Sequence, residues 1–141
     1  MVDIYISKYQ NRQTIMNIII IAIGGAIGSL SRYGLNKLFL EDSGGNTFAT
    51  FIANSTGSFI LGFLVAYIST KPEWPPEIKL FLSIGILASY TTFSTFTVSS
   101  IYLIENGELI KALINISGSI LVGLVAAYIG IILGRTITNI I

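Results

Sequence analysis

Long apolar segments alternate with short polar connections along the chain. The uncharged runs are residues 14–31, 43–70, 80–104 and 112–134. A helix needs about 20 predominantly apolar residues to cross the hydrocarbon core of a bilayer. The pattern therefore predicts four transmembrane helices. We expect them at 15–39, 47–69, 78–102 and 111–135.

The connections between these helices are short and polar. They read EDSGGN, TKPEWPPE and ENGE, and all three prolines fall in the second. The polar start, MVDIYISKYQNRQ, has no short apolar core followed by small residues, so we do not predict a signal peptide. We expect residues 1–141 to form one all-α membrane domain with both termini on the same side.

Composition narrows the class of protein. The chain is 52% hydrophobic and 11% charged, with a mean hydropathy of +0.78, which is typical of membrane proteins. A net charge of +1 argues against a nucleic-acid partner. The sequence contains neither cysteine nor histidine, so it has no thiolate chemistry and lacks the commonest general base and zinc ligand.

Basic residues give only a thin orientation signal. Five are expected on the terminal side and three on the other: Lys8, Arg12, Lys71, Lys79 and Arg135 against Arg32, Lys37 and Lys111. One interpretation is that the termini are cytoplasmic. The other is that the chain inserts both ways round, which would permit antiparallel assembly. The small size of the domain also favours a homo-oligomer.

Small residues recur four positions apart in three of the four predicted helices. The pairs include Gly24 and Gly28, Ser58 and Gly62, and Gly130 and Gly134. Within lipid, such faces let helix backbones approach closely. We therefore interpret most of these glycines as packing positions.

Polar side chains lie at membrane depth in three helices. They include Asn54 in the second, Ser94 and Thr95 in the third, and Asn115 and Ser119 in the fourth. A single Ser or Thr usually bonds its own helix, but a track on three helices indicates a hydrogen-bonding path. No carboxylate falls in any predicted helix. A path of hydroxyls and amides beside Arg32 favours a small anion over a proton or a cation.

The stretch SYTTFSTF, residues 89–96, combines this polarity with two aromatic rings. Phe93 and Phe96, three residues apart, share one helix face, and ring edges carry partial positive charge that could contact an anion. Its β-branched and hydroxyl residues disfavour a regular helix. We predict a break between Ala88 and Thr92, whose freed carbonyls would need a neighbour, water or a cation.

Four motifs in order resemble the Fluc (CrcB) family of small dual-topology fluoride channels. They are GGAIGSLSRY, TFIANSTGSFILG, TTFSTF and ALINISGSILVGLVAAYIG, one in each predicted helix. The resemblance implies a passive channel of the cell membrane, not an enzyme. It also implies two antiparallel copies in lipid, with two fluoride pores along their interface and a third helix broken near its middle.

The resemblance also implies roles for individual residues. Phe93 and Phe96 would present ring edges to fluoride, and Asn54 would position the anion and the rings. The polar track would continue through Ser94, Thr95, Ser119 and Asn115, with Arg32 near the vestibule. Backbone carbonyls of Ala88 and Thr91 from both copies would hold a structural sodium ion at the dimer centre.

Three positions depart from the family's usual residues. Ala88 stands where glycine is common, Ser99 where glutamate is common, and Asn115 where tyrosine is common. These changes leave open that the chain is one subunit of a heterodimeric channel. A non-conducting scaffold subunit is a further alternative.

Two other classes of membrane protein fit the sequence less well. A small multidrug exporter needs a carboxylate in its first helix, and the predicted helix at 15–39 has none. An intramembrane enzyme would lack a base for any serine nucleophile.

Overall fold

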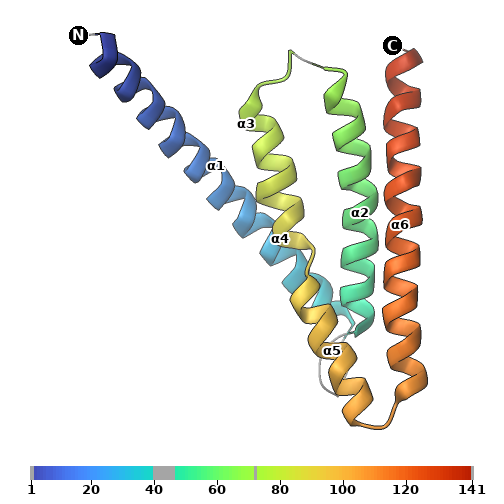
Figure 1. The fold of residues 1–141 in the computed structure, drawn as a ribbon. Helices are drawn as coiled ribbons and strands as arrows, with labels where there is room; N and C mark the ends of the chain where they lie inside the picture. Colours follow the sequence, from blue (N-terminus) through green and yellow to red (C-terminus); the bar gives the residue numbers. More distant parts are fainter. Residues whose placement is uncertain (1, 40–46, 72, 141) are drawn as a thin grey trace.

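The computed structural model describes residues 2–39, 47–71 and 73–140, and this part of the chain is helical with short connections and no strand. Figure 1 shows the order of the elements. They are α1 (Val2–Leu38), α2 (Thr47–Ser69), α3 (Pro76–Lys79), η1 (Leu80–Leu87), α4 (Ala88–Tyr90), α5 (Phe93–Glu105) and α6 (Leu109–Ile140).

Four helical segments within the described ranges are long and apolar enough to cross a membrane. They are Gln10–Leu38, Thr47–Ser69, Pro76–Glu105 and Leu109–Thr138. The prediction of an all-α membrane protein with four transmembrane helices is therefore confirmed. Helix α1 begins well before residue 15 because residues 2–14 contain no proline or glycine that would end a helix.

The helices form two packed pairs. Helix α2 lies along α6, and α1 crosses η1 and α4. The start of α1 and the end of α6 lie at the same end of the molecule (Figure 1), as the short connections predict. Large apolar side chains cover the outer faces, where Leu30 is 68% and Tyr128 66% exposed. Such faces suit a lipid environment.

Small residues bring the backbones of each pair into contact. A Cβ atom added at Gly28 would overlap the carbonyl oxygen of Ile86 in η1, and one added at Gly130 would overlap the carbonyl oxygen of Phe59 in α2. Both positions therefore need a residue without a side chain. The packing role predicted for these glycines is confirmed.

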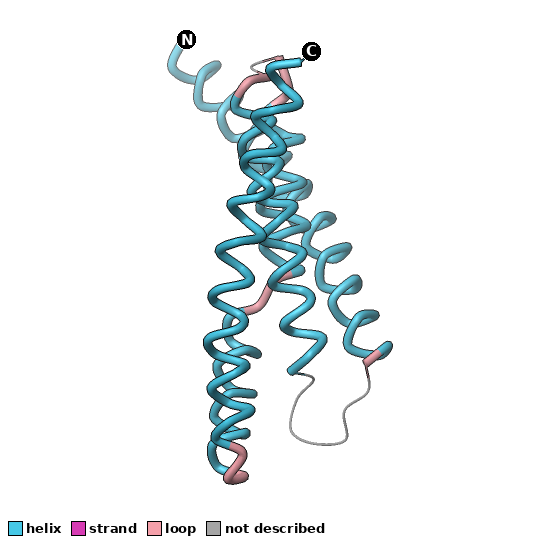
Figure 2. The backbone as a smooth tube through the Cα atoms, turned by 90° about the vertical axis from the view of Figure 1, so that its right-hand side faces the viewer, coloured by secondary structure: helices cyan, strands magenta, loops and turns pink. Residues whose placement is uncertain are grey.

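The third transmembrane segment is interrupted near its middle. Thr91 and Thr92 are extended, with φ/ψ of −78°/156° and −150°/116°, between α4 and α5. This loop lies about halfway along the molecule in Figure 2. The predicted break between Ala88 and Thr92 is confirmed.

A second irregularity precedes the break. Element η1 is π-helical, and the N–H of Ala88 donates to the carbonyl of Ser83, five residues earlier. The sequence analysis did not predict this wider turn. π-Helical turns often accompany functional sites.

Candidate functional site

The break in the third segment is held by one side chain from α2. Asn54 Nδ2 donates to the carbonyl oxygen of Thr92 at 3.0 Å. The N–H of Thr92 donates to Asn54 Oδ1 at 2.8 Å. A single amide therefore satisfies both backbone groups of an extended residue that is 8% exposed. Without it, the N–H of Thr92 would lack a partner inside the membrane, whereas its carbonyl, as that of the N-cap, also accepts the first hydrogen bond of α5.

The hydroxyl of Thr92 caps the start of the next helix, α5. Thr92 is the N-cap of α5, and its Oγ1 accepts from the N–H of Thr95 at 3.2 Å. The same oxygen lies 3.0 Å from Thr95 Oγ1 and 3.2 Å from Ser94 Oγ. A threonine N-cap of this kind stabilises a helix start. The predicted residues Ser94 and Thr95 thus meet at one hydroxyl cluster beside the break.

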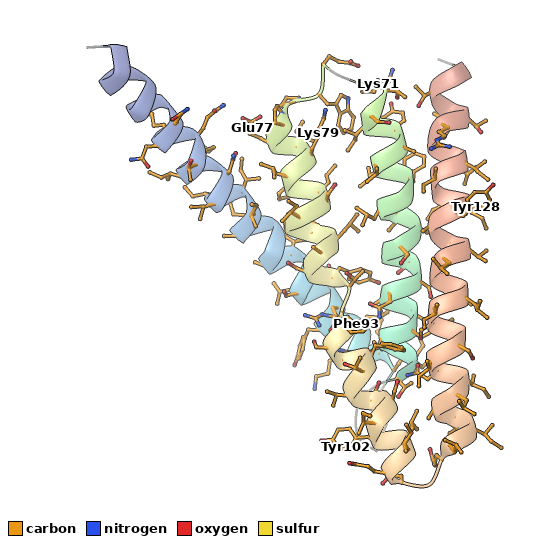
Figure 3. The ribbon with its side chains drawn as sticks, in the orientation of Figure 1. Lys71, Glu77, Lys79, Phe93, Tyr102 and Tyr128 are labelled. Carbon is orange, nitrogen blue, oxygen red and sulfur yellow. The ribbon has the colours of Figure 1, made fainter. Side chains whose placement is uncertain are left out.

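Two phenylalanine rings follow directly on the first turns of α5. The ring centroids of Phe93 and Phe96 are 5.7 Å apart, and the ring planes are tilted by 45°. Phe96 is 8% exposed, whereas Phe93 is 76% exposed and lies at the top of α5 next to the break (Figure 3). One ring is therefore fixed in the chain's interior, and the other stands at its surface.

A second hydrogen-bonded network joins α6 to α5. Ser119 Oγ donates to Asn115 Oδ1 at 3.5 Å, and Asn115 Nδ2 donates to Ser100 Oγ at 2.9 Å. Ser100 Oγ in turn donates to the carbonyl oxygen of Phe96 at 2.8 Å. The predicted residues Asn115 and Ser119 are thus connected to the backbone of Phe96.

Two backbone carbonyls at the break lose their usual helical donors. In a continuous α-helix the N–H groups of Thr92 and Thr95 would bond to the carbonyls of Ala88 and Thr91. Here those N–H groups bond to Asn54 Oδ1 and Thr92 Oγ1 instead. The two carbonyls predicted from the resemblance are therefore among those that the break releases at the end of α4, and they could serve as oxygen ligands for a hard cation.

Arg32 stands apart from both networks. It follows Gly24 and Gly28 at four-residue spacing, so it lies on the face of α1 that packs toward η1 and α4. Its side chain is half-buried and has no hydrogen bond or ion pair with the described residues. Arg32 therefore takes no part in the hydrogen bonds of either network.

Sequence reasoning missed the two residues that connect the predicted ones. Thr92 is bonded to Asn54, Ser94 and Thr95, and Ser100 bonds Asn115. Thr92 could have been found, because a threonine directly before an apolar residue, here Phe93, fits a helix start. Ser100 gave no such signal, since its partner lies on another helix.

The chain matches proteins of known family over most of its length. Residues 19–131 match the family model described as CrcB-like protein, Camphor Resistance (CrcB). A protein named fluoride-specific ion channel FluC from Hydrogenobaculum sp. is 40% identical over 120 residues, covering 84% of this chain and 98% of that protein.

Two further relatives have the same name. The protein from Shewanella halifaxensis is 39% identical over 115 residues, covering 81% of this chain and 92% of its own length. The protein from Thermus thermophilus is 39% identical over 122 residues, covering 86% of this chain and 97% of its own length. The similarity extends over nearly the whole length of each relative.

Proposed function

The chain belongs to the CrcB-like family and is a multi-pass integral protein of the cell membrane, and we propose that it is a fluoride-selective channel that exports fluoride passively. The names of its relatives support this function. The observation that carries it is the break at Thr91 and Thr92, which Asn54 holds directly beside Phe93 and Phe96.

The chemistry of this site suits a small anion. Fluoride holds its water tightly, so a pore must offer strong replacement contacts along its length. Hydroxyls of Ser94, Thr95 and Ser119, the amide of Asn115 and the ring edges of Phe93 and Phe96 are donors or positive edges without a carboxylate among them. Such groups in a narrow path favour fluoride over the larger chloride.

We propose that two antiparallel copies form two pores along their interface. Phe93 is 76% exposed in a single chain, so one copy does not enclose a path around this ring. A second copy would complete the wall. The nearly balanced basic residues at the two ends are compatible with insertion in both orientations.

A structural sodium ion at the centre of this dimer fits the residues present. The oxygen ligands would be the backbone carbonyls of Ala88 and Thr91. These carbonyls lose their usual helical hydrogen bonds because the N–H groups of Thr92 and Thr95 bond to side chains instead. Carbonyl oxygens suit a hard cation, and an alanine at position 88 still provides one. A bound ion would tie the two breaks together.

Sodium binding is tested by thermal unfolding of the purified protein. Exchange of sodium for N-methylglucamine at constant ionic strength should lower the unfolding temperature, because a ligand that binds only the folded state stabilises it. Identical unfolding curves in the two buffers would remove sodium from the proposal.

Channel function in cells is tested by growth in fluoride. A bacterial strain without its own fluoride channel should tolerate more external fluoride when it expresses this chain, and expression of Phe93→Ile should not restore growth. If the wild-type chain is present in the membrane and gives no protection, a missing sister subunit or a scaffold role replaces the self-sufficient channel.

A further inference from the structure

We propose that Ser100 is a positioning residue that fixes the orientation of the Asn115 side-chain amide and thereby creates a fluoride-binding station with Ser119. This inference rests on the proposed channel function. Ser100 lies on α5, is 4% exposed, and is the side chain through which the α6 network reaches the backbone of Phe96.

The orientation follows from the single proton on the Ser100 hydroxyl. That proton is donated to the carbonyl oxygen of Phe96 at 2.8 Å. The Ser100 oxygen can therefore only accept from Asn115, and it does so from Nδ2 at 2.9 Å. A flipped amide would face Ser100 Oγ with Oδ1, and two acceptors would then meet without a proton between them.

The fixed amide leaves two donors for an anion. The second N–H of Asn115 has no acceptor among the described residues, although Asn115 is 8% exposed. Ser119 donates to Asn115 Oδ1 at 3.5 Å, well beyond the usual O–H···O distance of about 2.8 Å. This hydroxyl can therefore turn toward an anion with little loss. Both donors depend on the amide orientation that Ser100 sets.

Ser99 provides a matched control on the same turn of α5. It is 3% exposed and also donates to the carbonyl oxygen of Phe96, at 3.1 Å. No hydrogen bond joins Ser99 to Asn115 in the described part of the chain. Removal of either hydroxyl therefore costs the same kind of local bond, but only removal of the Ser100 hydroxyl releases the amide.

The first test measures fluoride efflux from liposomes as a function of fluoride concentration. Ser100→Ala should raise the half-saturating concentration about fivefold, as loss of one hydrogen bond predicts, and Asn115→Ala should do the same. The double variant should be no worse than Asn115→Ala alone. Ser99→Ala should stay near the wild type, and Ser100→Thr, which keeps the hydroxyl, should restore the wild-type value.

The second test does not depend on conduction. In protein labelled with ¹⁵N-asparagine, the Asn115 amide signals are identified by their loss in Asn115→Ala. Ser100→Ala should shift and broaden these signals, whereas Ser99→Ala should leave them unchanged. Fluoride should shift them in the wild type.

The two tests separate failure of this inference from failure of the proposed function. The positioning role of Ser100 would be overturned if Ser100→Ala and Ser99→Ala gave the same fluoride efflux and the same Asn115 amide signals. A wild-type protein that passes no fluoride would contradict the channel, and the spectrum of Ser100→Ala would still decide whether Ser100 orients Asn115.

Discussion

Asn54 and Thr92 lie 38 residues apart, yet the Asn54 side chain bonds both backbone groups of Thr92, at 3.0 and 2.8 Å. This pairing replaces the helical hydrogen bond that the break takes from the N–H of Thr92. It also fixes the start of α5, and hence the place of both phenylalanine rings, relative to α2. The position of the Phe93 and Phe96 rings relative to α2 thus depends on the side-chain amide of Asn54.

Removal of this amide should therefore affect both stability and flux. Asn54→Ala leaves the N–H of Thr92 without its partner, and an unsatisfied buried group costs about 1–3 kcal/mol. We expect a clearly lower unfolding temperature and a fluoride flux reduced about tenfold or more. Asn17→Ala on α1, where the side chain has no hydrogen bond to the described residues, is the control. Wild-type fluoride flux in Asn54→Ala would show that the conformation of the break does not depend on the Asn54 side chain.

The close approach of α1 and η1 predicts opposite effects for two glycines on one helix. A Cβ at Gly28 would overlap the carbonyl oxygen of Ile86, whereas a Cβ at Gly34 meets nothing within 4 Å. Gly28→Ala should lower the free energy of unfolding by about 1–3 kcal/mol. Gly34→Ala should be neutral or stabilising by up to about 1 kcal/mol, since alanine favours helix. Thermal unfolding in detergent measures both, and equal effects would contradict the packing described.

The exposed ring of Phe93 should matter for flux and not for folding. Phe93 is 76% exposed, so Phe93→Ile should leave the unfolding temperature of the protein nearly unchanged while fluoride flux falls about tenfold or more. Tyr128→Ile is the matched control, because Tyr128 is a 66% exposed aromatic residue on α6 away from the break (Figure 3). A Phe93→Ile protein with full flux would exclude this ring from the pathway.

Dual orientation can be tested directly because the sequence contains no cysteine. Asn106→Cys introduces one thiol in the exposed turn between α5 and α6. If the chain inserts both ways, a membrane-impermeant maleimide should label about half of the protein in intact cells. Complete labelling or none would show a single orientation and would contradict the antiparallel dimer.

Ser55 tests whether a buried hydroxyl without a hydrogen-bond partner lowers the stability of the protein. Its hydroxyl oxygen is buried and has no hydrogen-bond partner among the described residues. Because an unsatisfied buried hydroxyl is unfavourable, Ser55→Ala should leave stability unchanged or raise it by about 1 kcal/mol. A loss of stability would mean that water or an ion bonds this hydroxyl.

Local sequence predicted the features that depend on single helices. Apolar runs gave the four transmembrane helices, and the hydroxyl and β-branched residues of SYTTFSTF located the break at Thr91 and Thr92. Small residues at four-residue spacing marked the contacts of Gly28 and Gly130. Each of these signals acts within a few turns of one helix.

Features that depend on two helices were not predictable in the same way. The hydrogen bond between Asn115 and Ser100 depends on which face of α6 lies against α5. Because α5 carries several hydroxyl residues, the sequence did not indicate which of them would bond to Asn115. The π-helical element η1, which packs against α1, also had no signal in the local sequence. Tertiary packing therefore decides which polar side chains meet.

The most direct test of the channel is fluoride efflux from liposomes that contain only this purified chain. A fluoride electrode records efflux after valinomycin releases the potassium counter-charge, and chloride-loaded liposomes provide the selectivity control. We predict rapid fluoride loss with no loss of chloride. No fluoride efflux from well-folded protein, or equal efflux of the two anions, would contradict a self-sufficient fluoride-selective channel.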